Sequence, residues 1–125
     1  MKSLEINGKE YPLSFGLDFI REMDKRYTVD AQGFPLGAGL QSALIYLVQE
    51  NPTVLEDIIL SATHTLRSVP SHKDIESWIE EKYEDDSIDG VYKDFLSAFE
   101  NAPLTKKKTK EMLVAMETQE NPTEA

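Results

Sequence analysis

The sequence predicts an α+β fold that is mostly α, with an N-terminal β-hairpin packed on a bundle of about five or six short helices. Two patterns predict it: an Asn-Gly pair between alternating apolar residues, and apolar residues at spacings of three and four from about residue 15 onward. A length of 125 residues suits one domain with its own core and is short for two. We therefore expect a single domain over residues 1–117 and a flexible polar tail over residues 118–125.

The predicted hairpin covers residues 2–13, where apolar and polar residues alternate on both sides of Asn7-Gly8. An Asn-Gly pair favours a type I′ turn because both central positions need a positive φ angle. A lone hairpin is only marginally stable in water, so its apolar face must pack on another element.

The next segments are a helix over residues 15–27, with Ser14 as its cap, and a loop over Thr28–Gly39. The loop is predicted from its four Gly and Pro residues, and its apolar residues indicate that it packs on the body. A second helix fits residues 40–50 and ends before Pro52, which cannot continue it.

Four further helical segments follow, separated by proline residues and acidic turns. Thr53 is the expected cap of the first, and Ser71 with Asp74 resembles a capping box at the start of the second. The predicted helices cover residues 53–67, 71–84, 87–101 and 104–117.

Composition excludes several classes of protein. The chain has no cysteine, which removes thiol catalysis, thiolate metal sites and disulfides, and its net charge of −10 argues against nucleic-acid binding. The longest apolar run, residues 43–48, is far shorter than a membrane span, so we expect no membrane partner. The opening residues also lack the apolar stretch of a signal peptide.

Candidate metal and catalytic residues are few. Residues 85–90 resemble the front half of an EF-hand loop, but Leu96 stands where calcium needs a glutamate, so we interpret the segment as an acidic helix-capping turn. His64 and His72 lack a partner at ligand spacing, and His64 should point to solvent. We expect no enzyme activity, cofactor or metal, since no carboxylate pair has the surroundings that acid-base catalysis requires.

Two apolar surfaces are candidates for binding a partner. The helix over residues 40–50 is apolar over more than one stripe, so it is either the centre of the bundle, which we favour, or partly a docking face. The last helix has a methionine-rich edge, which suits variable partners or merely docks that helix. The candidate residues are Leu40, Leu44, Tyr46, Leu47, Met112, Leu113 and Met116.

Charge is concentrated near the carboxyl end. Residues 71–100 have a net charge of −7, and the single cationic cluster follows them. Head-to-tail pairing of these patches would favour a homo-oligomer, whereas a solvated basic run is the simpler alternative. The candidate residues are Lys106, Lys107 and Lys108 with Glu80, Glu81, Glu84 and Asp85.

Several phrases resemble one known family. The segment LEINGKEYPL, residues 4–13, running into FGLDFIREMD, residues 15–24, is similar to the start of tail assembly chaperones of long, non-contractile-tailed phages and prophages of Gram-positive bacteria. The likeness continues through the Gly-rich loop to the helix containing Trp78 and ends in residues 120–122, so it covers most of the chain.

The resemblance implies a non-catalytic protein of the host cytoplasm. Such chaperones bind the tape measure protein, keep its apolar helical stretches soluble while the tail tube polymerises, act in many copies and leave before the virion is finished. They commonly have a longer, frameshifted form, so the implied partners also include the tail tube protein and that form.

A second interpretation is a small acidic adaptor or inhibitor that occupies a basic, nucleic-acid-binding surface of another protein. Its binding residues would lie in the acidic stretch 76–89 rather than on the apolar helices. An enzyme is the third alternative, and it would need a pocket with perturbed titratable groups.

Overall fold

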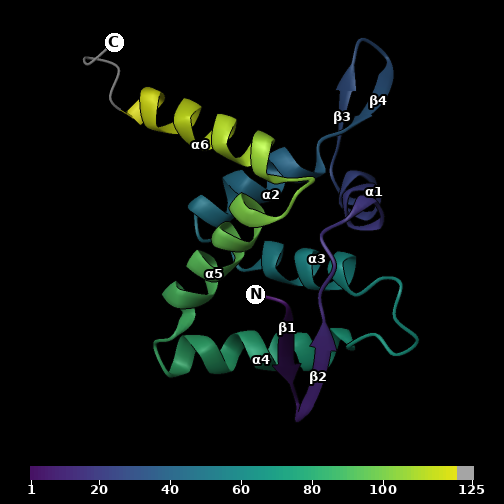
Figure 1. Ribbon diagram of the computed structural model, residues 1–125, viewed down its shortest axis with the longest axis vertical. Helices are drawn as coiled ribbons and strands as arrows, with labels where there is room; N and C mark the ends of the chain where they lie inside the picture. The colour runs from purple at the N-terminus through teal and green to yellow at the C-terminus, as the bar shows by residue number, and fades with distance from the viewer. Residues whose placement is uncertain (121–125) are drawn as a thin grey trace.

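The computed structural model describes residues 1–120 and contains six helices and two separate β-hairpins within that range (Figure 1). The elements are β1 (Ser3–Ile6), β2 (Lys9–Pro12), α1 (Leu17–Arg26), β3 (Thr28–Ala31), β4 (Phe34–Gly37), α2 (Gly39–Val48), α3 (Thr53–Ala62), α4 (His72–Glu84), α5 (Ile88–Asn101) and α6 (Lys106–Glu120). The predicted class, mostly α with an N-terminal hairpin on a helical bundle, is confirmed.

The first hairpin forms as the Asn-Gly signal predicts. Asn7 and Gly8 have φ angles of 52° and 76°, and the register pairs Leu4 with Tyr11. The hairpin lies against α4 and the loop before it (Figure 1), where Asn7 Nδ2 donates to Asp74 Oδ1 at 3.4 Å. Its inner face buries Ile6 and Tyr11, which supplies the packing that a hairpin needs to be stable.

The prediction of a packed loop over Thr28–Gly39 is wrong in two respects. The segment forms the antiparallel hairpin β3–β4, closed by Gln32 and Gly33 with φ angles of 54° and 88°. Figure 1 shows this hairpin extending away from the helices, and its large apolar side chains are exposed rather than packed. Pro35 is tolerated because the register places it opposite Asp30, the second pair from the turn, where strand NH groups point outward.

The core lies between α1, α2, α3 and α5, with α4 and α6 packed at its two ends. Helix α2 is the central helix, and Leu44 and Leu47 are almost completely buried. Phe15, Phe19 and Phe99 join α1 to α5, with ring centroids 5.1 to 5.6 Å apart. The wide apolar stripe of α2 therefore reflects burial on several sides.

Caps and helix ends differ from the sequence prediction in detail. Helix α1 begins after Gly16 rather than after Ser14, and α3 ends at Ala62 because the chain then turns. Thr53 is the first residue of α3 and not its cap, since the N-cap position is Pro52, and the backbone N of Thr53 donates to Asn51 Oδ1 at 3.1 Å.

Two further features concern the cap of α4 and the end of α6. Ser71 Oγ accepts from the backbone N of Asp74 at 3.1 Å, which confirms the predicted cap of α4. Helix α6 runs to Glu120, three residues into the predicted tail, and residues 121–125 of that tail lie outside the described residues. Within residues 1–120, no helix has the length and apolar character needed to cross a bilayer.

Candidate functional site

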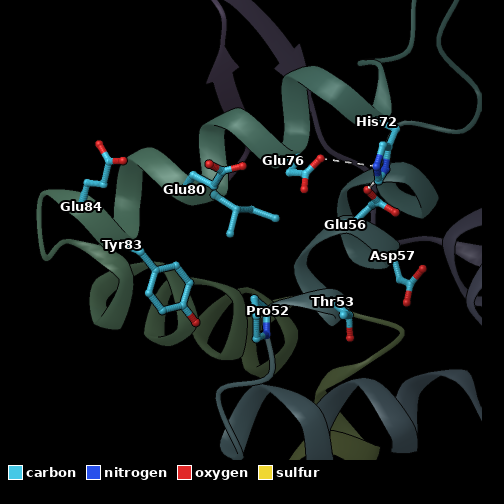
Figure 2. A pocket seen from close by; sticks show the side chains of 10 residues that line it. Pro52, Thr53, Glu56, Asp57, His72, Glu76, Glu80, Tyr83 and Glu84 are labelled. Atoms are coloured by element: carbon cyan, nitrogen blue, oxygen red, sulfur yellow. Dashed lines mark hydrogen bonds and ion pairs between the residues drawn. The ribbon is translucent and has the colours of Figure 1, made fainter.

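A groove of about 580 Å³ separates the start of α3 from the outer side of α4 (Figure 2). Its floor is apolar, and its rim has five carboxylates and one histidine. The lining residues are Pro52, Thr53, Glu56, Asp57, His72, Glu76, Ile79, Glu80, Tyr83 and Glu84. Such a groove suits an elongated ligand that is both apolar and cationic.

The acidic rim on α4 is a regular row. Glu76, Glu80 and Glu84 are spaced by four residues, so they follow one line along about 12 Å of helix. Beside this row, Ile79 and Tyr83 form the apolar floor. Lys82 does not neutralise the row, because its ammonium lies over the Trp78 ring at 5.6 Å from the centroid.

The two ends of the groove are fixed by polar contacts. At one end, His72 Nδ1 contacts Glu56, and its Nε2 lies 3.6 Å from Glu76 Oε2. At the other end, the Tyr83 and Tyr92 hydroxyls lie 2.8 Å apart and connect α4 to α5. Burial, with the hydrogen bond to Tyr83, raises the pKa of Tyr92 well above its usual value.

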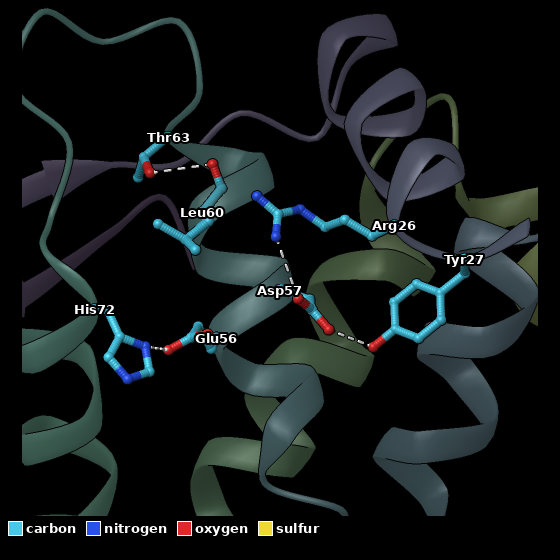
Figure 3. Close-up of polar contacts among 7 residues, drawn as sticks. All are labelled: Arg26, Tyr27, Glu56, Asp57, Leu60, Thr63 and His72. Carbon is cyan, nitrogen blue, oxygen red and sulfur yellow. Dashed lines mark hydrogen bonds and ion pairs between the residues drawn. The ribbon is translucent and has the colours of Figure 1, made fainter.

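A second polar cluster connects α1 to α3 beside the groove (Figure 3). Asp57 accepts from the Tyr27 hydroxyl, and its Oδ1 lies 3.3 Å from Arg26 Nη1. Burial and the Asp57 carboxylate together raise the pKa of Tyr27 well above its usual value. The cluster therefore connects α3, which forms one wall of the groove, to the end of α1, where the β3–β4 hairpin begins.

Replacing Tyr27 by phenylalanine should lower the free energy of unfolding by about 1 kcal/mol at pH 7, since the variant leaves Asp57 without this donor. The raised pKa means that the tyrosine's contribution is complete below pH of about 10 and is lost as the pH rises toward its folded pKa. Urea unfolding at pH 7 and pH 11 should therefore show a smaller alkaline loss of stability in Tyr27→Phe than in the parent.

The matched control is Tyr46→Phe. Its ring lies 5.8 Å from that of Tyr27, and its hydroxyl has no hydrogen bond among residues 1–120. Equal alkaline losses in the parent and in Tyr27→Phe would contradict this assignment.

The predicted partner-binding residues of α2 belong to the core instead. Leu40, Leu44 and Leu47 are at most 8 % exposed, which agrees with the alternative that α2 is the centre of the bundle. Tyr46 is half-buried beside Tyr27. The physical reason is that α2 is covered on several sides, which was the favoured alternative.

The edge formed by Met112, Leu113 and Met116 is half-buried. The two methionines pack against the core, which docks α6 on α2 and α5. This edge is therefore already used within the chain, as in the simpler alternative.

The most exposed apolar surface is one that the sequence did not indicate. The register pairs Val29 with Leu36 and Ala31 with Phe34, so these four side chains share one face of the β3–β4 hairpin. Val29, Leu36 and Phe34 are 51 %, 53 % and 71 % exposed. Apolar residues alternate around Gln32-Gly33, which is typical of a hairpin. The glycines and the proline of the segment favour a loop instead, and the prediction followed them.

The predicted self-association residues divide into two groups. Glu80 and Glu84 line the groove, whereas Glu81 and Asp85 do not, and Asp85 Oδ1 accepts from the backbone N of Ser87 at 3.0 Å. Lys108 lies 3.7 Å from Glu111. The Ser87 hydrogen bonds lower the pKa of Asp85 and account for the EF-hand-like segment as a local turn.

The two histidines are exposed side chains. His64 is 51 % exposed, as expected, although its Nε2 lies 3.3 Å from Glu22 Oε1. In the part of the chain that the structure describes, no group of three or more His, Asp or Glu side chains is placed to hold a metal ion.

Comparison with known proteins gives one match. A family model described as phage tail assembly chaperone protein, TAC, matches residues 3–113, which is most of the chain. No curated protein and no solved structure matches. The matched range includes the groove, the β3–β4 hairpin and the first half of α6.

Proposed function

The chain belongs to the family of phage tail assembly chaperones, and from this membership we propose that it binds the tape measure protein and keeps it soluble while the tail tube polymerises. The family match is the observation that supports the proposal. It favours this role over that of an acidic inhibitor, and it indicates a function without catalysis.

The β3–β4 hairpin is the surface that we assign to the tape measure protein. Val29, Phe34 and Leu36 form an apolar face that is more than half exposed, and an isolated two-stranded hairpin is only marginally stable in water. Packing this face on apolar helical stretches of a client would remove apolar surface from water on both partners. A net charge of −10 would keep the resulting complex from aggregating.

The remaining roles follow from the same proposal. The chaperone acts in the host cytoplasm and leaves before the virion is complete. The tail tube protein and a longer, frameshifted form of the chain itself are its further partners.

Co-expression with a tape measure fragment tests the role. The parent chain should raise the soluble fraction of the fragment and co-elute with it in size exclusion. The double variant Phe34→Ser/Leu36→Ser should bind the fragment about tenfold more weakly, because it removes the two most exposed apolar side chains of the hairpin face.

The matched control is Leu17→Ser/Leu104→Ser, which removes two leucines that are 57 % and 53 % exposed elsewhere. It should bind like the parent. If the parent neither solubilises nor co-elutes with the fragment, the tape measure role is wrong. If the parent binds and the hairpin variant binds equally well, only the assignment to the hairpin is wrong.

A further inference from the structure

Two oppositely charged surfaces of the chain have matching spacing. On α4, Glu76, Glu80 and Glu84 form a row at intervals of four residues beside an apolar floor. On α6, Lys106, Lys110 and Val114 repeat the same interval. Lys107 lies beside them, so the four side chains share an arc of about 100° on the outer side of the helix.

Four side chains on the outer face of α6, those of Lys106, Lys107, Lys110 and Val114, make no ion pair or hydrogen bond with another residue of the range 1–120. The opposite side of α6 is the docked one, with Thr105 and Thr109 buried and Met112 and Met116 packed on the core. Lys106, Lys107 and Lys110 are exposed and form no ion pair with any residue of the described range 1–120. Val114 is 62 % exposed.

The two surfaces cannot meet within one copy. Helix α5 connects them, and its 14 residues span about 21 Å. Figure 1 shows α4 and α6 at opposite ends of α5. The complementary charges are therefore available only to another molecule.

We propose that the chain self-associates head to tail, with the outer face of α6 of one copy docked in the α3–α4 groove of the next. Lys106, Lys107 and Lys110 meet the acidic rim. Val114 covers the floor at Ile79 and Tyr83.

A second copy is the occupant because the outer face of its α6 is both cationic and apolar, which complements the acidic rim and the apolar floor of the groove. The groove has five carboxylates on its rim, and the cationic cluster of α6 is the densest positive segment of the sequence. Since the two surfaces differ, the contact is heterologous and would build a ring or an open chain rather than a two-fold dimer.

Two charge-reversal variants test the contact. One is Lys106→Glu/Lys107→Glu/Lys110→Glu, and the other is Glu76→Lys/Glu80→Lys/Glu84→Lys. Light scattering after size exclusion, over a range of protein and salt concentrations, gives the mass of the species. The parent should associate and should do so less at high salt, and each variant alone should associate at least about tenfold more weakly.

Mixing the two variants is the decisive measurement. In the mixture each reversed surface meets a complementary one, so association should return to at least the level of a single parent contact. The control Lys2→Glu/Arg67→Glu/Lys93→Glu makes the same change in net charge as the lysine variant at exposed positions outside both surfaces, and it should associate like the parent. Far-UV circular dichroism checks that every variant is folded.

Three outcomes would overturn the proposal: a parent that stays monomeric at all concentrations, variants that associate like the parent, or a mixture that does not recover. A monomeric parent would also leave the groove to a cationic segment of another protein. The hairpin variant Phe34→Ser/Leu36→Ser should associate like the parent. The proposal of self-association can therefore fail while the proposed binding of the tape measure protein holds, and the reverse.

Discussion

Replacing Phe99 by alanine should lower the free energy of unfolding by about 3 to 5 kcal/mol, a large share of the stability of a domain of this size. Phe99 is completely buried, and its ring centroid lies 5.5 Å from that of Phe15 and 5.6 Å from that of Phe19. The substitution removes the ring that joins α5 to α1 and leaves a cavity in a tightly packed region. Urea unfolding at pH 7, followed by the fluorescence of the single tryptophan, Trp78, measures the loss.

Phe34→Ala is the matched control, because it makes the same chemical change on a side chain that is 71 % exposed. It should alter the free energy of unfolding by less than about 0.5 kcal/mol. Equal losses in the two variants would contradict the placement of Phe99 in the core and of Phe34 on the surface.

Sequence patterns predict the burial of Phe99 but not the exposure of Phe34. The periodicity of α5 predicts that Phe99 lies on a buried face, and the Asn7-Gly8 turn with its alternating neighbours predicts the first hairpin. Both signals are local, since each depends on residues within one element. The Ser71 cap is predictable for the same reason.

The second hairpin is also local, but its signal is mixed, whereas the exposure of Phe34 depends on the positions of distant segments. Pro35 and the glycines favour a loop locally, and only the pairing of Val29 with Leu36 shows that the segment is a hairpin. Whether its apolar face is covered then depends on where the helices lie. The sequence therefore held a weak signal for the hairpin and none for the exposure of its apolar face.

The candidate site shows the same division. The acidic stretch before the lysine cluster is visible in the sequence, and Glu80 and Glu84 are among the predicted residues that line the groove. The opposite wall comes from α3, some 20 residues earlier, and no local pattern places Glu56 beside His72. Conversely, an apolar helix such as α2 has the same sequence pattern whether it is buried or faces a partner.

Gly39→Ala should destabilise the chain by about 2 to 3 kcal/mol, because the added methyl group has no space. A Cβ at this position would lie 2.6 Å from the backbone N of Asp24 and closer still to the carbonyl carbon of Met23. These are backbone atoms of α1, so they cannot move aside as a flexible side chain would. The helix propensity gained by alanine, at most about 1 kcal/mol, is smaller than this steric cost.

The same close approach brings the backbone N of Gly39 to 2.9 Å from Asp24 Oδ1, which caps α2 from the neighbouring helix. Gly39→Ala should lengthen this hydrogen bond and loosen the point where the β3–β4 hairpin joins the body. The matched control is Gly90→Ala in α5, where a Cβ meets nothing within 4 Å. That substitution should raise the free energy of unfolding by about 0.5 to 1 kcal/mol. If Gly39→Ala lowers the free energy of unfolding and Gly90→Ala raises it, the cost arises from the packing of α2 on α1. If both substitutions change the free energy of unfolding in the same direction, this explanation is wrong.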